Sequence, residues 1–217
     1  MYTEPDSIDE QNLPLFPLNV VLFPGGMLPL HIFEQRYREM VKYCIRHESS
    51  FGIVMIKDGE ESGEAAKPCK IGTVVDLVEV DRFPDGRMNI VTSGHSRFEI
   101  LEVDNELPYL VGRVRILDAY DTEADKKLEK IASETRQLYI EYESLSSFLR
   151  FGWQPPEENP EHPQQLAFQI GSRLRIPNNE KQELLEIISF DELLKREIEI
   201  LKDFNRQIAF QLAARNN

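Results

Sequence analysis

Residues 13–34 form an apolar stretch, LPLFPLNVVLFPGGMLPLHIFE, that approaches the length of a membrane span but is interrupted by four prolines. A membrane helix needs roughly 18 to 20 apolar residues without breakers, and each proline inside a helix costs about 3 kcal/mol. A helix over residues 13–30 is therefore excluded. Proline removes a backbone donor and fixes φ, which favours edge strands and rigid corners. The four are Pro14, Pro17, Pro24 and Pro29.

The composition is that of a folded chain with an acidic surface. Of the 217 residues, 41% are hydrophobic and 29% are charged, so a core can form. The net charge of −13 comes from 38 acids against 25 bases, with the two signs interleaved along the chain. Such a surface repels phosphate backbones and anionic lipid, so we expect no nucleic-acid partner and no membrane. Residues 1–12 carry no Lys or Arg and no apolar centre, which predicts a cytoplasmic protein with an acidic, flexible N-terminus.

The segment 13–118 shows the pattern of strands. Short apolar runs alternate with Gly, Pro and Asp, and a Pro-Asp-Gly turn would fold residues 75–83 back onto residues 87–92. One helix, beginning near Phe33, interrupts the strands, with Phe33, Tyr37, Met40 or Val41, and Cys44 at helical spacing. The expected strands are residues 20–23, 27–32, 51–56, 71–80, 88–92, 97–103 and 110–117.

The segment 119–217 shows the period of helices. A first helix is expected after Thr122, and a Pro-rich, acidic connector is expected at residues 153–163. Beyond it, helices are expected near residues 163–175, 179–188 and 190–213. We therefore predict an α+β fold, with an N-terminal antiparallel sheet curled into a barrel and a C-terminal α-helical bundle.

The sequence offers no clear catalytic motif. No glycine is followed by lysine, so the Walker loop of ATPases is missing. The segment Gly94-His95-Ser96-Arg97-Phe98 lacks the last glycine of a hydrolase elbow. The four histidines are scattered, and the two cysteines show no metal-ligand spacing. We expect no catalytic residues, no cofactor and no metal.

The N-terminal stretch resembles the N-terminal domain of the Lon family of ATP-dependent proteases. Residues 71–100 resemble the central hairpin of that domain, and residues 176–201 resemble its terminal helices. The resemblance covers residues 13 to about 205, nearly the whole chain. The matching N-terminal positions are Leu13, Pro14, Leu15, Pro17, Phe23, Pro24, Gly25, Pro29, Leu30, Ile32, Phe33, Glu34, Arg36 and Tyr37.

This resemblance implies a PUA-like β subdomain followed by a helical bundle. In full-length Lon proteases the domain precedes an ATPase module and a proteolytic module with a Ser-Lys pair. Neither motif occurs in this sequence, so the chain resembles free-standing Lon-domain proteins, and we expect no protease activity. The resemblance implies instead the binding of protein substrates or partners.

Three hypotheses about function follow. The first is a non-catalytic module, an adaptor in protein quality control, that binds unfolded or apolar polypeptide segments between the barrel and the helix. Phe33, Arg36 and Tyr37 are the candidate peptide-binding residues, although all three would equally serve to pin the helix to the barrel. The second is a hydrolase with a dispersed site of Asp, Glu and His. The third is RNA binding through the PUA-like barrel, which would need a basic stripe.

Overall fold

The computed structural model describes residues 10–59, 67–117, 126–151 and 159–215. Contacts divide these residues into two compact units. The first unit takes the described residues of Met1–Tyr120 and Ile176–Glu186, and the second takes those of Asp121–Arg175 and Ile187–Asn217.

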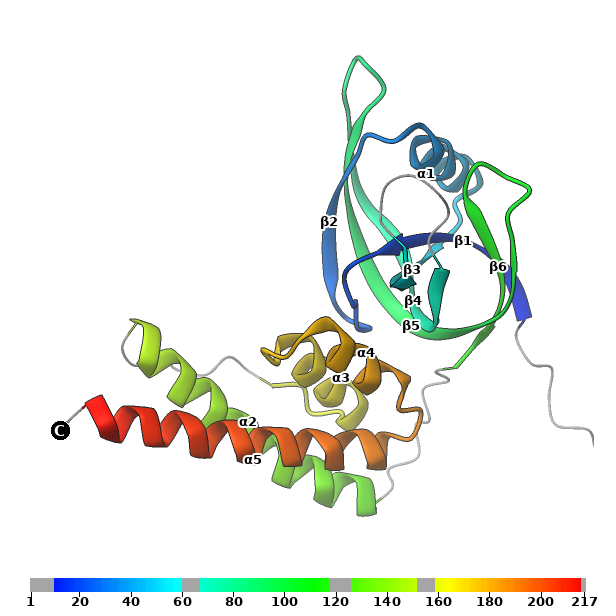
Figure 1. Ribbon diagram of the computed structural model, residues 1–217. Coiled ribbons are helices and arrows are strands. Elements are labelled where there is room, and N and C mark those ends of the chain that lie inside the picture. Colours follow the sequence, from blue (N-terminus) through cyan, green and yellow to red (C-terminus); the bar gives the residue numbers. More distant parts are fainter. Residues whose placement is uncertain (1–9, 60–66, 118–125, 152–158, 216–217) are drawn as a thin grey trace, which may run out of the picture. The chain divides into compact units, whose positions relative to one another are not determined.

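Over the described residues the chain forms six strands and five helices (Figure 1). The strands are β1 (Glu10–Leu18), β2 (Met27–Ile32), β3 (Phe51–Asp58), β4 (Lys67–Arg82), β5 (Met88–Asp104) and β6 (Leu110–Ile116). The helices are α1 (Gln35–His47), α2 (Lys126–Phe151), α3 (Pro163–Arg173), α4 (Asn178–Glu186) and α5 (Phe190–Arg215).

The six strands form one mixed sheet in the order β2-β5-β4-β3-β1-β6. Because β6 pairs again with β5, the strands other than β2 close into a ring, as Figure 1 shows. The pairing of β1 with β3 is parallel, and the other pairings of the sheet are antiparallel. The predicted α+β fold with a curled, largely antiparallel sheet is therefore confirmed, with one parallel pair that the sequence analysis did not include.

One apolar cluster takes side chains from every strand of the ring. The cluster therefore lies inside the ring. Phe98 is fully buried there, and its ring lies against two glycines. A Cβ atom would come within 2.7 Å of the Phe98 ring at Gly52 and within 2.6 Å at Gly72. Glycine at both positions therefore makes the space that the aromatic ring fills. The cluster consists of Leu13, Leu15, Val54, Cys69, Val74, Phe98, Ile100, Leu110 and Val114.

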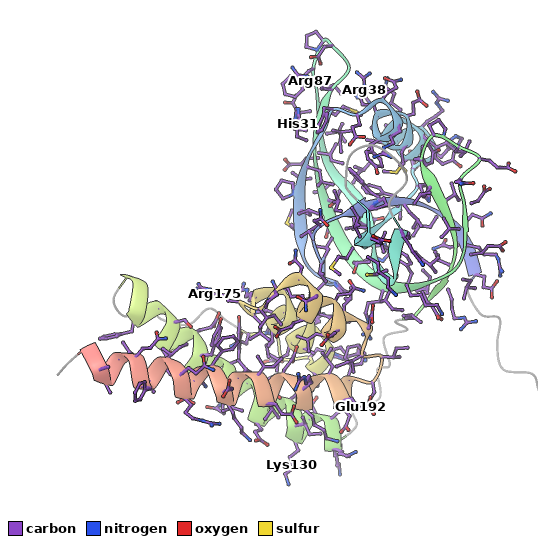
Figure 2. The ribbon with its side chains drawn as sticks, viewed as in Figure 1. His31, Arg38, Arg87, Lys130, Arg175 and Glu192 are labelled. Carbon is purple, nitrogen blue, oxygen red and sulfur yellow. The ribbon has the colours of Figure 1, made fainter. Side chains whose placement is uncertain are left out.

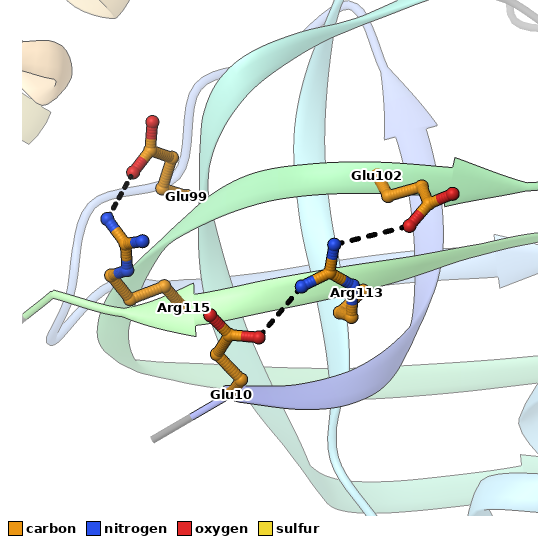
Figure 3. Close-up of polar contacts among 5 residues, drawn as sticks. All are labelled: Glu10, Glu99, Glu102, Arg113 and Arg115. Carbon is orange, nitrogen blue, oxygen red and sulfur yellow. Dashed lines mark hydrogen bonds and ion pairs between the residues drawn. The ribbon is translucent and has the colours of Figure 1, made fainter. Parts of the chain in front are cut away.

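Ion pairs join the strands that close the ring (Figure 3). The Arg113 guanidinium on β6 donates to Glu10 of β1 at 2.8 Å and to Glu102 of β5 at 3.2 Å. Arg115 donates to Glu99 of β5 at 3.4 Å. The two carboxylates raise the pKa of Arg113. Exposed pairs of this kind are individually weak, so their main effect is to favour one register in the pairing of β6 with β1 and β5.

The hairpin predicted from the Pro-Asp-Gly turn is formed by β4 and β5, but both strands are longer than predicted. The β4–β5 pairing has register shifts near Val75 and Val78. With these shifts the same two strands take part in the ring and continue beyond it, to the part of β5 that pairs with β2. The strand predicted at residues 20–23 is wrong, because these residues pair with no strand. Their position is fixed instead by the Thr73 hydroxyl, which donates to the Leu22 carbonyl at 2.6 Å.

Helix α4 belongs to the first unit, although the sequence analysis placed it in the helical segment 119–217. The Gln182 amide donates to the carbonyl of Ile71 on β4 at 3.0 Å. The fully buried guanidinium of Arg97 on β5 donates to the carbonyl of Leu185 at 3.1 Å. These bonds satisfy buried polar groups, and they tie the helix to the sheet across more than 80 residues of sequence.

The second unit consists of α2, α3 and α5, at the positions predicted for helices. The long helices α2 and α5 run along each other (Figure 1), and the Asn205 amide of α5 donates to the Leu138 carbonyl of α2 at 3.0 Å. Residues 152–158 of the predicted connector and residues 1–9 lie outside the described residues, while residues 10–12 belong to β1. No helix in the described ranges is long and apolar enough to cross a membrane.

Candidate functional site

Helix α1 turns one face to the sheet and leaves another beside the β4–β5 hairpin. Its buried residues are Tyr37, Met40, Val41 and Cys44, which share one face of the helix. They pack in a cluster with Phe16, Phe51 and Ile53 of the sheet. Burial of this apolar face fixes the rotation of the helix, so Lys42 and Arg46 fall on an adjacent, exposed side.

The hairpin ends in a tight turn at Pro84, Asp85 and Gly86. The backbone N–H of Gly86 donates to the Phe83 carbonyl at 3.0 Å, and that of Phe83 donates to the Arg87 carbonyl at 2.9 Å. Gly86 has φ of +85°, a conformation in which a residue without Cβ meets no steric cost. The Asp85 carboxylate accepts from the Arg87 backbone and guanidinium, and these bonds lower the pKa of Asp85.

Arg38 ties this turn to α1. Its Nη1 atom donates to the Asp85 carbonyl at 2.9 Å, and its other terminal nitrogen donates to the Gln35 side chain. A Cβ atom on Gly86 would lie only 3.1 Å from the same Nη1. Figure 2 shows Arg38 on the helix and Arg87 near the tip of the hairpin. The separation of helix and hairpin is therefore set by a specific contact.

A groove of about 340 Å³ lies between α1 and the hairpin. The helix contributes Lys42, Ile45 and Arg46 to its lining. The hairpin contributes Arg82, Phe83, Gly86 and Met88. Three of these side chains are apolar and three are cationic, and no carboxylate lines the groove among the described residues.

The cations of the groove differ from others in the first unit. Arg36, Arg87 and Arg113 pair with carboxylates at 2.7 to 3.0 Å. The side chains of Lys42, Arg46 and Arg82 are exposed and make no ion pair or hydrogen bond within the part of the chain that the structure describes. The groove therefore joins an apolar surface to three cations that pair with no carboxylate of the described ranges.

The exposed rings of His31 and Phe33 form an aromatic group that continues from the groove along the hairpin. The His31 ring lies 6.1 Å from the ring of Phe33 and 6.1 Å from that of Phe83, which also lines the groove. Nδ1 of His31 lies 2.7 Å from Oδ1 of Asn89, within hydrogen-bond distance. Phe33 is 57% exposed, so its ring offers apolar contact area outside the core.

None of the three residues selected from the sequence lines the groove. Phe33 is exposed beside it, as described above. Arg36 pairs with Glu34 at 3.0 Å and lies over the Tyr37 ring at 4.6 Å. Tyr37 is buried, with its ring 4.0 Å from that of Phe16. These contacts fasten the start of α1 to the sheet, and a peptide-binding role for the three residues stays a prediction.

One polar cluster has the residue types of a hydrolase site in a different arrangement. Oγ of Ser96 lies 2.9 Å from Nδ1 of His95, while Nε2 of the same ring lies 3.7 Å from Asp76, too far for a hydrogen bond. The Ser50 hydroxyl donates to that carboxylate at 2.6 Å. The His95 and Asp76 side chains are 45% and 61% exposed, so the imidazole is not oriented in a site that excludes water. This cluster gives the hydrolase hypothesis no support.

The described residues contain no group of three or more His, Cys, Asp or Glu side chains placed to hold a metal ion.

Comparison with known proteins identifies the family. The family model of the ATP-dependent protease La (LON) substrate-binding domain matches residues 12–203. Over 203 residues, 89% of this chain, the sequence is 32% identical to a Lon protease of Anaeromyxobacter dehalogenans. It is 31% identical over 205 residues to Lon protease 2 of Myxococcus xanthus. The chain spans only about a quarter of the length of these relatives, 24% and 25%.

Solved structures agree with this assignment. A Lon N-terminal domain protein from Xanthomonas campestris superposes with a TM-score of 0.62 at 25% identity, over 86% of this chain and 96% of that one. The N-terminal domain of the Mycobacterium avium complex Lon protease gives a TM-score of 0.59 at 16% identity, over 90% and 98%, and supports the fold alone. The chain belongs to the family of the ATP-dependent protease La (LON) substrate-binding domain.

Proposed function

We propose that this chain binds unfolded or apolar segments of other polypeptides, and that it acts by binding rather than by catalysis. The family description, a substrate-binding domain of an ATP-dependent protease, supports the class of ligand. The observation that carries the proposal is the open groove between α1 and the hairpin, in which Ile45 and Phe83 provide partly exposed apolar surface. A folded protein buries most of its large apolar side chains, so such a groove favours chains that expose several of them in an extended segment.

The exposed aromatic group extends the contact surface beyond the groove. An extended segment lying along the hairpin would place one side chain against Phe83 in the groove and another near Phe33. Aromatic side chains give large contact area with few rotatable bonds, which suits the binding of varied sequences. An adaptor in protein quality control would need this breadth, because its ligands share exposed apolar residues rather than one sequence.

The test is binding of a protein in two states. A reduced protein with its thiols blocked by a neutral reagent, unable to refold, is compared with its native form by fluorescence anisotropy. We expect the unfolded form to bind and the native form not to bind. Phe83→Ser should weaken binding about tenfold, as expected for an apolar contact residue. Leu107→Ser is the matched control, because Leu107 is 50% exposed in the same unit but lies outside the groove.

Two results would count against the proposal. One is equal, background-level binding of the unfolded and native forms. The other is an equal loss of affinity in Leu107→Ser, which would mean that the groove has no special part in binding. Circular dichroism of both variants must match that of the unmodified chain, so that a loss of affinity is not a loss of fold.

A further inference from the structure

The cations of the groove stand out against the charge of the chain as a whole. The chain carries a net charge of −13, which disfavours the approach of any anionic ligand at long range. Nevertheless Lys42, Arg46 and Arg82 line one groove together, and none of them has a carboxylate partner in the described ranges. Since no carboxylate among the described residues pairs with these cations, a ligand that supplies carboxylates around an apolar side chain would complement the groove.

The arrangement of the three cations limits the form of that ligand. Lys42 and Arg46 are one helical turn apart on α1, and Arg82 lies on β4, which belongs to the facing hairpin. Arg82 is directly opposite Met88 in the strand register, so a cation and an apolar side chain stand next to each other. The long side chains of the three cations can reach carboxylates on both sides of a group that occupies the groove.

The volume and lining of the groove favour a peptide over a nucleic acid. A volume of about 340 Å³ is at the small end of ligand pockets, which fits a few side chains rather than a structured ligand. Binding of a nucleic acid needs a track of cations along several phosphates, with aromatic rings on which bases stack. Among the described residues that line the groove only Phe83 is aromatic, and the net charge opposes a polyanion.

We propose that the groove between α1 and the β4–β5 hairpin binds polypeptide segments in which carboxylates flank an apolar side chain. The inference rests on the proposed function, polypeptide binding, and adds the sequence class of the ligand. The apolar side chain packs against Ile45 and Phe83, which are partly exposed, while Met88 beneath them is buried. The flanking carboxylates pair with the cations on either side, and Arg82 can donate two parallel N–H bonds to one carboxylate because its guanidinium presents a planar fork.

The test uses the full chain and four labelled peptides of equal length. The first peptide carries Asp and Glu around a central Leu, and in the second and third these acids are replaced by Gln or by Lys. The fourth keeps the acids and replaces Leu by Ser. We expect the acidic peptide with Leu to bind roughly tenfold more tightly than the Gln peptide at low salt, and the advantage to shrink as salt rises.

The chain offers a matched pair of double variants. Lys42→Gln with Arg46→Gln removes two cations of the groove. Lys126→Gln with Lys130→Gln removes two exposed cations with the same spacing on α2, which belongs to the second unit (Lys130 is labelled in Figure 2). The groove variant should lose the roughly tenfold advantage of the acidic peptide, because two exposed ion pairs are removed, while the α2 variant should retain it.

The outcomes separate this inference from the proposed function. If unfolded protein binds but the acidic and Gln peptides bind equally, polypeptide binding stands and the acidic preference is overturned. An equal loss in both double variants would assign the preference to overall charge and also overturn it. If neither the peptides nor unfolded protein bind, the proposed function itself fails. Tighter binding of a single-stranded RNA, lost in the groove variant, would assign the groove to nucleic acid instead.

Discussion

Glu197 provides a test of the packing inside the second unit. It lies on α5 with its side chain fully buried, and neither carboxyl oxygen has a hydrogen-bond partner among the described residues. Burial raises the pKa of Glu197 well above its ordinary value of 4.5, and the nearby backbone of Gly171 offsets this only in part. A buried carboxyl of this kind is held in its protonated form, because the charged form would lose its hydration without a partner.

The sign of the effect on stability follows from the raised pKa. Below about pH 4.5 Glu197 is protonated in both the folded and the unfolded state, and its full contribution to stability is present. As the pH rises above this value, the unfolded state loses the proton while the folded state keeps it. The free energy of unfolding then falls by about 1.4 kcal/mol per pH unit, until the pH passes the raised pKa.

Two substitutions at Glu197 separate the titration from the packing. Glu197→Gln should remove this pH dependence, so that the variant becomes more stable than the unmodified chain as the pH rises. Glu197→Met also removes the unpaired polar group and keeps an unbranched helix-forming side chain, which should add about 1 to 3 kcal/mol near neutral pH. Glu199→Gln is the control, because that side chain lies on the same helix and is 68% exposed.

The measurement is amide hydrogen exchange of α5 in the full chain, from about pH 5 to about pH 7, corrected for the intrinsic exchange rate. It reports the free energy of opening of this helix even when the two units unfold separately. If the stability curves of the unmodified chain and Glu197→Gln run parallel across this window, Glu197 titrates as it does in the unfolded chain. That result would refute the assignment of a raised pKa to burial.

Further predictions concern the hairpin, the barrel core and the thiols. Gly86→Ala should destabilise the first unit by about 1 to 2 kcal/mol, measured by urea unfolding, because alanine must adopt a φ of +85°; a variant of unchanged stability would contradict this. Phe98→Ala should cost about 3 to 5 kcal/mol in the same assay, because the ring fills space that glycines such as Gly72 leave open, and a loss below 1 kcal/mol would show that the barrel collapses onto the gap. Cys44 and Cys69 are buried, and burial raises the pKa of both thiols. Iodoacetamide near pH 8 should therefore modify them far more slowly in the folded chain than in urea. Equal rates of modification would contradict their burial.

Helix α1 shows how far periodicity reaches. The spacing predicted a shared face for Tyr37, Met40 or Val41, and Cys44, and in the structure all four residues are buried. Phe33 was placed on the same face, but it is 57% exposed. The reason is that α1 begins at Gln35, so Phe33 lies before the first turn and does not follow the helical period. A pattern predicts which residues share a face only within the element itself.

The sequence did not predict contacts between elements that lie far apart in the chain. Strand β2 and helix α1 lie between β1 and β3 in the chain, and a connection of this length permits the parallel pairing that the structure shows. The spacing of apolar residues in α4 predicted a helix. It did not predict that the Gln182 side chain donates a hydrogen bond to the sheet. The groove joins Lys42 and Arg46 to Arg82, about 40 residues away, and their meeting depends on which face of the hairpin packs on α1. The sequence indicated a groove beside this helix, whereas its lining residues required the structure.

The prolines of the N-terminal stretch follow from how each strand is paired. Strand β1 lies between β3 and β6 in the sheet, where a proline would ordinarily remove a needed hydrogen bond. However, its residues 10–15 pair with β6 and its residues 15–18 pair with β3. Each half therefore has a side without a partner strand, and Pro14 and Pro17 lie in different halves. Pro29 lies on β2, the edge strand of the sheet.

The same stretch positions the groove. Because β2 pairs with β5 at the hairpin, the chain that leaves it at Ile32 enters α1 beside the turn that Arg38 holds. A continuous apolar helix over these residues would have removed both the edge strand and this entry to α1. The prolines thus act on the candidate site indirectly, by requiring an extended chain that delivers α1 and its cations to the hairpin.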